Sequence, residues 1–121
     1  MKMLRVIRVL KSLSPIPIKA TFLGAHALPH EYKNNKAAYM YLVCNEMLPR
    51  VAGEGLADYI DIFCETGYFD LDDLKQVIES GDKHGLKAKV HVNQFSSFGA
   101  VKMACEMGVL SVDHLEVMTE D

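Results

Sequence analysis

The fold of this chain is decided by residues 59–93, which read YIDIFCETGYFDLDDLKQVIESGDKHGLKAKVHVN. The first six residues are mostly apolar and rich in Ile and aromatic side chains, which is typical of a strand covered on both faces. Asp70 then favours the start of a helix as its N-cap, and Gly85 fits the position just after the helix ends. Residues 87–93 alternate between polar and apolar side chains, which indicates a second strand. The stretch therefore predicts a strand, a helix and a parallel strand.

The same alternation continues on both sides of this unit. Hydrophobic spacing predicts helices over residues 2–13, 35–48 and 97–107, and strands over 18–23 and 109–115. Pro49 is expected to break or restart the second of these helices, because proline has no backbone N–H to donate. No linker divides the chain, so residues 1–121 are predicted to form a single α/β segment of about four parallel βα units. Such a segment fits either half of an eight-stranded barrel or a small open sheet.

Composition narrows the class of protein. The chain has 121 residues, 50% of them hydrophobic and 24% charged, as in an ordinary soluble domain. A net charge of −3 gives no reason to expect nucleic acid or an anionic membrane as a partner. No apolar run approaches the roughly 18 residues that would cross a bilayer. The first helix is expected to pack through its apolar side chains and to expose its basic ones to solvent. The apolar side chains are Met3, Leu4, Ile7, Leu10 and Leu13. The basic ones are Lys2, Arg5, Arg8 and Lys11.

The three cysteines, Cys44, Cys64 and Cys105, are widely spaced and form no CxxC pair. A zinc site built from cysteine is therefore not indicated. Each thiol is expected to fill space in the core. Unpaired thiols are typical of a reducing compartment, which predicts a cytoplasmic protein.

Chemically useful side chains gather where the predicted strands end. They are His26 after the first strand, Glu65 after the second, His91 and Gln94 at the third, and Asp113 and His114 at the fourth. Active residues of parallel βα proteins lie at the carboxyl ends of the strands. A cluster of neutral imidazoles with nearby carboxyl or amide groups suits a divalent metal and a water that the metal acidifies.

Other kinds of site are not indicated. A single histidine at a strand end is more often a hydrogen-bonded structural residue, but three such histidines at three strand ends favour a shared site. Ser96 and Ser97 lie near His91, yet the stretch has no GxSxG motif for a serine nucleophile. Phosphate-binding GxGxxG and GxxxxGK[ST] motifs are absent from the sequence as well.

Several segments of the chain resemble the imidazolonepropionase family, a branch of the metal-dependent amidohydrolase superfamily. They are TFLGAHALPHEYK (21–33), LVCNEMLPRVA (42–52), DIFCETGYF (61–69), KVHVNQFSSFGA (89–100) and SVDHLE (111–116). The resemblance implies a partial (β/α)8 barrel and a small-molecule substrate, 4-imidazolone-5-propanoate, whose cyclic amide is hydrolysed to N-formimidoyl-L-glutamate. It also implies one bound zinc or iron(III) ion.

The resemblance assigns roles to four residues. His91 matches a metal-binding histidine, and Gln94 matches a position that contacts substrate and aids proton transfer. Because an amide cannot act as a general base, the role of Gln94 would be hydrogen bonding. His114 matches a histidine near the metal-bound water, as a base or oxyanion stabiliser, and His26 matches a substrate contact.

The chain also departs from the family pattern, which has an HxH metal-binding pair and a further aspartate ligand. Neither is present here, so at most one protein ligand of the expected four remains, and the isolated chain is expected to lack useful activity. Open strand edges are expected to favour self-association. Two alternatives are a non-catalytic βα interaction module and another cyclic amidohydrolase or deaminase of the same superfamily.

Overall fold

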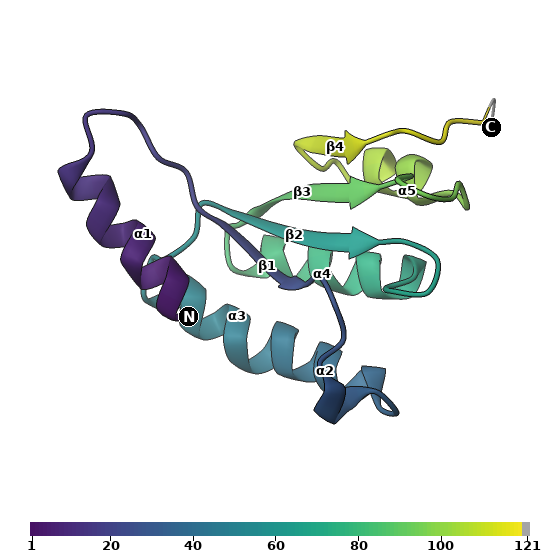
Figure 1. Ribbon diagram of the computed structural model, residues 1–121, viewed down its shortest axis with the longest axis horizontal. Coiled ribbons are helices and arrows are strands. Elements are labelled where there is room, and N and C mark those ends of the chain that lie inside the picture. The colour runs from purple at the N-terminus through teal and green to yellow at the C-terminus, as the bar shows by residue number, and fades with distance from the viewer. Residues whose placement is uncertain (120–121) are drawn as a thin grey trace.

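Four parallel strands form one sheet in the order β1-β2-β3-β4, as Figure 1 shows for a computed structural model in which residues 1–119 are described. The strands are β1 (Thr21–Ala25), β2 (Tyr59–Cys64), β3 (Lys87–Val92) and β4 (Ser111–His114). Each strand pairs in parallel with the next one along the chain. The predicted α/β class with four parallel strands is confirmed, and the arrangement is that expected of part of a (β/α)8 barrel.

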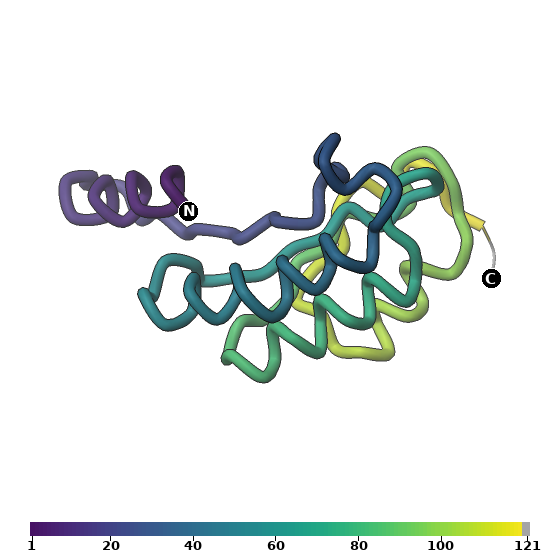
Figure 2. The backbone as a smooth tube through the Cα atoms, turned by 90° about the horizontal axis from the view of Figure 1, so that it is seen from below, coloured from purple at the N-terminus to yellow at the C-terminus, as the bar shows by residue number. Residues whose placement is uncertain are grey.

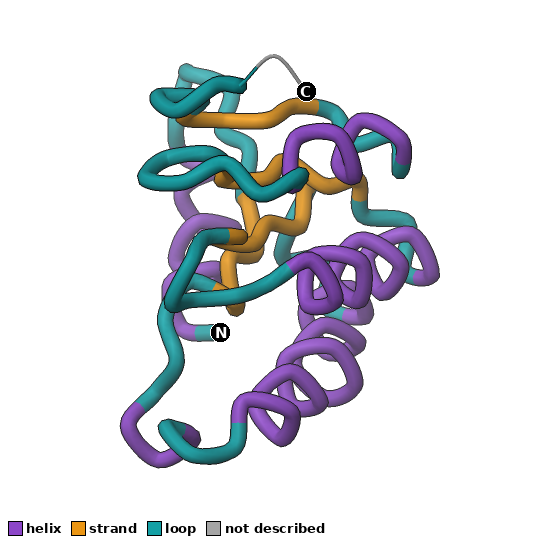
Figure 3. The backbone as a smooth tube through the Cα atoms, turned by 90° about the vertical axis from the view of Figure 1, so that its right-hand side faces the viewer, coloured by secondary structure: helices purple, strands orange, loops and turns teal. Residues whose placement is uncertain are grey.

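One helix precedes β1, and the helices that follow β1 connect the strands and cover one side of the sheet (Figure 3). The helices are α1 (Lys2–Leu13), α2 (Lys36–Tyr41), α3 (Leu48–Gly53), α4 (Leu71–Lys83) and α5 (Ala100–Glu106), with a 3₁₀ turn at His30–Tyr32 and a π-helical segment at Leu42–Met47. Of the two predicted outcomes at Pro49, a break or a restart of the second helix, the structure shows a restart, because a new α-helix begins at Leu48. The π-helical segment ends at Met47, and the N–H of Leu48 donates to the Val43 carbonyl. Pro49 follows in the first turn of α3, where no N–H is required.

The two faces of the sheet differ in chemistry. Side chains facing the helices are apolar and buried, among them Ile60, Ile62 and Cys64 of β2 and Ala88, Val90 and Val92 of β3. They pack with Leu74, Val77 and Ile78 of α4 in one core. The alternate residues of β2 and β3 face the other way and include Asp61, Phe63 and His91. The polar groups of the strands therefore collect on the face that the helices leave open.

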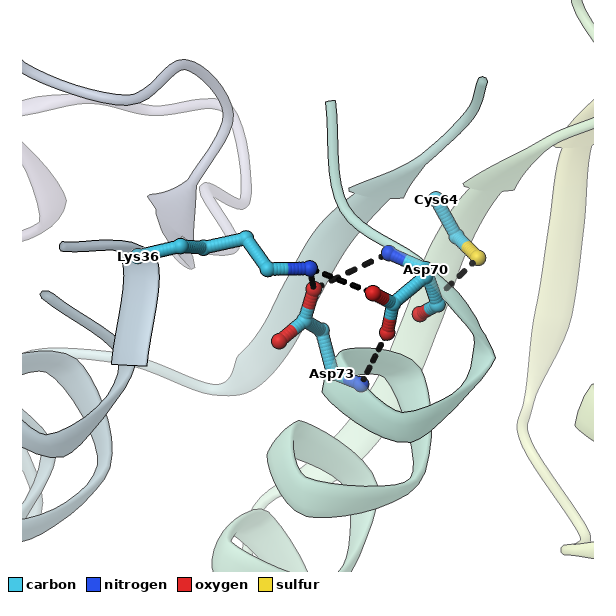
Figure 4. Close-up of polar contacts among 4 residues, drawn as sticks. All are labelled: Lys36, Cys64, Asp70 and Asp73. Atoms are coloured by element: carbon cyan, nitrogen blue, oxygen red, sulfur yellow. Dashed lines mark hydrogen bonds and ion pairs between the residues drawn. The ribbon is translucent and has the colours of Figure 1, made fainter. Parts of the chain in front are cut away.

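A charged network fixes the start of α4 against α2 (Figure 4). Asp70 and Asp73 form a capping box, in which each side chain accepts a hydrogen bond from the backbone N–H of the other residue. The ammonium of Lys36, at the first turn of α2, contacts both carboxylates and lies 2.5 Å from Asp73 Oδ2. The predicted N-cap is confirmed, and so is the end of the helix at Gly85, whose φ is +73°.

We expect the contact between Lys36 and Asp70 to stabilise the fold at neutral pH and to lose this effect in acid. The pKa of the Asp70 carboxyl lies below its usual value, chiefly because Lys36 donates a hydrogen bond to it. A carboxyl with a lowered folded-state pKa contributes stability above its unfolded pKa of about 3.9, and this contribution is lost as pH falls through the folded value. Lys36→Met should therefore reduce the free energy of unfolding by about 0.5–1 kcal/mol near neutral pH and by less in acid.

Urea unfolding of both proteins at about pH 7 and about pH 3 measures this difference. Lys33→Met is the matched control, because Lys33 is exposed and makes no ion pair within residues 1–119. An equal loss at the two pH values would contradict the expectation.

Three predicted element boundaries are wrong by a few residues. β1 begins at Thr21 rather than residue 18, because it starts where its partner β2 begins at Tyr59. Helix α5 begins at Ala100 rather than residue 97, because Gly99 has a φ of +92° that no helix contains. β4 covers only Ser111–His114, since φ turns positive at His114 and Leu115.

The surroundings of α1 and of one cysteine also differ from the prediction. Only Leu4 of α1 is buried, while Met3, Leu10 and Leu13 are exposed, because α1 lies at the end of the molecule opposite the C-terminus (Figure 2). Its basic side chains Lys2, Arg5 and Arg8 are exposed as predicted, and two ion pairs also form, with Arg5 2.6 Å from Glu54 and Lys11 2.5 Å from Asp58. Cys44 and Cys64 are buried as predicted, but Cys105 is exposed because it lies on the outer side of α5.

Among the helices of residues 1–119, none has the length and apolar character needed to cross a membrane.

Candidate functional site

The histidines singled out from the sequence lie at one edge of the sheet, where the parallel strands end. His91 is the penultimate residue of β3, His114 is the last residue of β4, and His26 directly follows β1. Gln94 lies two residues beyond the end of β3. Parallel strands bring their carboxyl ends together, so four separate positions in the sequence share one rim of the molecule.

His91 is held by a buried carboxylate on the neighbouring strand. Its Nδ1 lies 2.9 Å from Oδ1 and 2.8 Å from Oδ2 of Asp61, which is 5% exposed. Burial raises the pKa of the Asp61 carboxyl, and the contact with His91 acts in the opposite direction. An ionised carboxylate can only accept a hydrogen bond, so with Asp61 ionised Nδ1 of His91 is the donor, and in the neutral ring Nε2 is then the nitrogen that keeps its lone pair.

His114 lies beside His91, with their ring centroids 5.1 Å apart. His114 pairs in register with Val92, whose side chain points into the core. Paired residues of neighbouring strands face the same side of a sheet, so in a regular strand the His114 side chain would also point toward the helices. The chain leaves strand geometry at His114, where φ is +83°. Positive φ is unusual for a residue other than glycine and is concentrated at functional sites. Nδ1 of His114 contacts Glu116 Oε1 at 3.3 Å.

His26 is separated from these two histidines by an aromatic side chain. Its ring centroid lies 5.7 Å from that of Phe63, and the Phe63 centroid lies 6.5 Å from that of His91. His26 is exposed. The structure therefore brings His91 and His114 into contact and places His26 farther along the same rim.

Glu65 fixes the loop that contains Gln94. Its carboxylate is buried and accepts hydrogen bonds from the backbone N–H groups of Thr66 at 2.7 Å and Phe95 at 2.8 Å, and from the Ser96 hydroxyl. Burial alone would raise the pKa of Glu65, but these hydrogen bonds hold it below its usual value. Glu65 is thus an anchor for residues 93–98, while Gln94 is half-buried and its side chain makes no hydrogen bond within residues 1–119.

Asp61 is the residue that sequence reasoning missed. Residues 59–64 were interpreted only as a buried strand, so their single charged side chain received no role. A charged residue within an otherwise apolar strand is a usable signal, because burying a carboxylate without a partner is costly. That signal pointed to a partner on an adjacent strand, and His91 occupies that place.

His91 fits the part of a metal ligand, but the described residues do not provide a complete site. Its Nε2 lone pair is the donor that zinc and iron accept from imidazole. Within residues 1–119, no group of three or more His, Cys, Asp and Glu side chains is arranged to hold a metal ion. Any such ion would need further ligands from outside this part of the chain.

Comparison with known proteins gives a consistent family of relatives, although no family model matches the chain. The chain is 59% identical over 121 residues to an imidazolonepropionase of Christiangramia forsetii and 57% identical over 120 residues to one of Flavobacterium psychrophilum. An imidazolonepropionase of Shewanella piezotolerans is 47% identical over 121 residues. These alignments cover 99–100% of the chain but only 29–30% of each relative. The chain therefore resembles a segment of these enzymes and spans less than a third of their length.

Proposed function

We propose that this chain is a segment of an imidazolonepropionase, a metal-dependent hydrolase that opens the cyclic amide of 4-imidazolone-5-propanoate to give N-formimidoyl-L-glutamate. The identity of 59% along the whole chain supports this proposal most strongly. The contact between His91 and His114 at the strand ends supports it independently, because those are the positions where such barrels place catalytic groups.

In this proposal His91 is one of the metal ligands and coordinates through Nε2. A zinc or iron ion bound there would lower the pKa of a water molecule and polarise the substrate carbonyl. The chain supplies one ligand, and the remaining ligands belong to parts of the longer protein outside residues 1–119. Imidazole suits both metals, so the choice between zinc and iron depends on those other ligands.

The other three residues act on the substrate. His114, 5.1 Å from His91 between ring centroids, is placed to accept a proton from the nucleophilic water or to stabilise the developing oxyanion. Gln94 is held near the rim by the loop that Glu65 anchors, and its amide hydrogen-bonds the substrate. His26 contacts the substrate from the β1 side, next to Phe63.

Two further properties follow from the same proposal. The free thiols Cys44 and Cys64 support a cytoplasmic location. β1 and β4 form the two edges of the described sheet, and open edges support self-association of the chain when the rest of a barrel is not there to pair with them.

A chimera tests the proposed function. The chain replaces the matching residues of the Christiangramia forsetii imidazolonepropionase, and turnover of 4-imidazolone-5-propanoate is compared with that of the unmodified relative. We expect kcat/KM within about tenfold of the relative, because differences that conserve packing cost little. A folded chimera that does not hydrolyse this substrate, or that hydrolyses only another cyclic amide, would contradict the assignment.

A further inference from the structure

The carboxylate of Asp61 lies on the open face of the sheet, where its contact is with the His91 ring. Asp61 projects from the middle of β2, between Tyr59 and Phe63, and its side chain is 5% exposed. Within residues 1–119, the His91 ring is the only side chain that hydrogen-bonds to it. Both oxygens of the carboxylate lie within 2.9 Å of Nδ1.

A role in stability alone does not account for Asp61. Burying a carboxylate costs free energy that one partner only partly returns, and an apolar side chain of similar size is often equally stable or more so. The neighbouring positions on this face are filled by Tyr59 and Phe63, which shows that aromatic groups fit there. The carboxylate must therefore be explained by what it does to His91.

The contact controls which nitrogen of His91 is available. An ionised carboxylate accepts from Nδ1–H, so the imidazole is held in the tautomer whose Nε2 is unprotonated. It also limits rotation of the ring, because the two oxygens share the Nδ1 proton from one side. His91 is 28% exposed at its side chain, so the rest of the ring stays accessible from the rim.

We propose that Asp61 is a positioning residue that presents Nε2 of His91 to the metal ion. The inference rests on the proposed function, in which His91 is a metal ligand. Carboxylate partners behind metal-binding histidines fix the tautomer, orient the ring and raise its basicity. Asp61 does not contact the substrate or the reacting atoms, and it acts only through His91.

Nitrogen NMR of the 121-residue chain, labelled with ¹⁵N at histidine and held near pH 8, measures the tautomer directly, because neutral imidazole predominates there. We expect Nδ1 of His91 to give the signal of a protonated ring nitrogen and Nε2 that of an unprotonated one. In Asp61→Ala the two signals should shift toward each other as both tautomers become populated. Asp61→Asn, which keeps an oxygen acceptor, should restore part of the wild-type difference.

Asp113→Ala is the matched control for the tautomer, because Asp113 pairs in register with His91 but its side chain makes no hydrogen bond to it within residues 1–119. It should leave both His91 signals unchanged. The proposal is overturned if both ring nitrogens of wild-type His91 give averaged signals, as expected when the two tautomers are mixed. That comparison needs only the wild-type spectrum and so does not depend on whether a variant folds.

Metal affinity of the chimera provides the second readout. Competition with a zinc chelator should show affinity reduced by about 10- to 100-fold in Asp61→Ala. If the unmodified chimera binds neither zinc nor iron, the proposed function itself fails. If it binds zinc and Asp61→Ala binds equally well with an unchanged tautomer, the hydrolase assignment stands and only the role of Asp61 is lost.

Discussion

The isolated 121-residue chain will not turn over 4-imidazolone-5-propanoate at a measurable rate, even with added zinc or iron. Catalytic zinc sites normally use three protein ligands, and residues 1–119 contain no group of three His, Cys, Asp and Glu side chains arranged to hold a metal. Without the metal, the chain lacks the group that activates the attacking water. We expect its rate to lie below that of the chimera by a factor on the order of 10⁶ or more, the lower end of enzymatic rate accelerations.

The assay compares equal concentrations of chain and chimera with the same added metal. A folded chain is verified beforehand by its near-ultraviolet circular dichroism, so that inactivity is not confused with unfolding. Turnover by the chain close to that of the chimera would show that a working site can form from these residues alone, and the expectation would then be wrong.

Replacing His91→Asn in the chimera should reduce kcat/KM by more than about 100-fold. Removing a residue that hydrogen-bonds to a metal ligand typically lowers metal affinity or activity by about 10- to 100-fold. Removing the ligand itself should lower kcat/KM by more than that. Asparagine leaves a polar side chain opposite Asp61, so the buried carboxylate still has a hydrogen-bond donor. The effect should therefore appear in activity more than in stability.

His84→Asn is the matched control for this substitution. His84 directly follows α4 and precedes the start of β3 at Lys87, at the opposite end of that strand from His91, and within residues 1–119 its Nδ1 contacts only the Ser80 carbonyl, at 2.9 Å. Its turnover should match that of the unmodified chimera within about twofold. Similar losses in both variants would indicate a general effect of removing a histidine and would count against a special role for His91.

Much of the fold follows from local signals in the sequence. The Asp70 N-cap, the glycine after α4 and the alternation of β3 each depend on neighbouring residues, and each was predicted correctly. The boundaries of β1 and β4 were less accurate because they depend on the partner strand. β1 starts where Tyr59 offers a pairing residue, which no local pattern around residues 18–21 encodes.

The candidate site was predictable in position but not in its contacts. The rule that active groups lie at the carboxyl ends of parallel strands placed His26, His91 and His114 on one rim. It could not foresee that positive φ at His114 turns its ring toward His91, since that conformation depends on the segment beyond β4. It also could not identify Asp61, whose partner is 30 residues away in the sequence.

The most direct test of the account is the metal content of the chimera. Atomic spectroscopy after exhaustive dialysis should find about one zinc or iron ion per chain in the unmodified chimera and in His84→Asn, and much less in His91→Asn, because structural and catalytic metal sites depend on each protein ligand. Equal metal content in the His91→Asn chimera and in the unmodified chimera would show that the His91 imidazole does not bind the ion. That result would contradict the claim that His91 is a metal ligand.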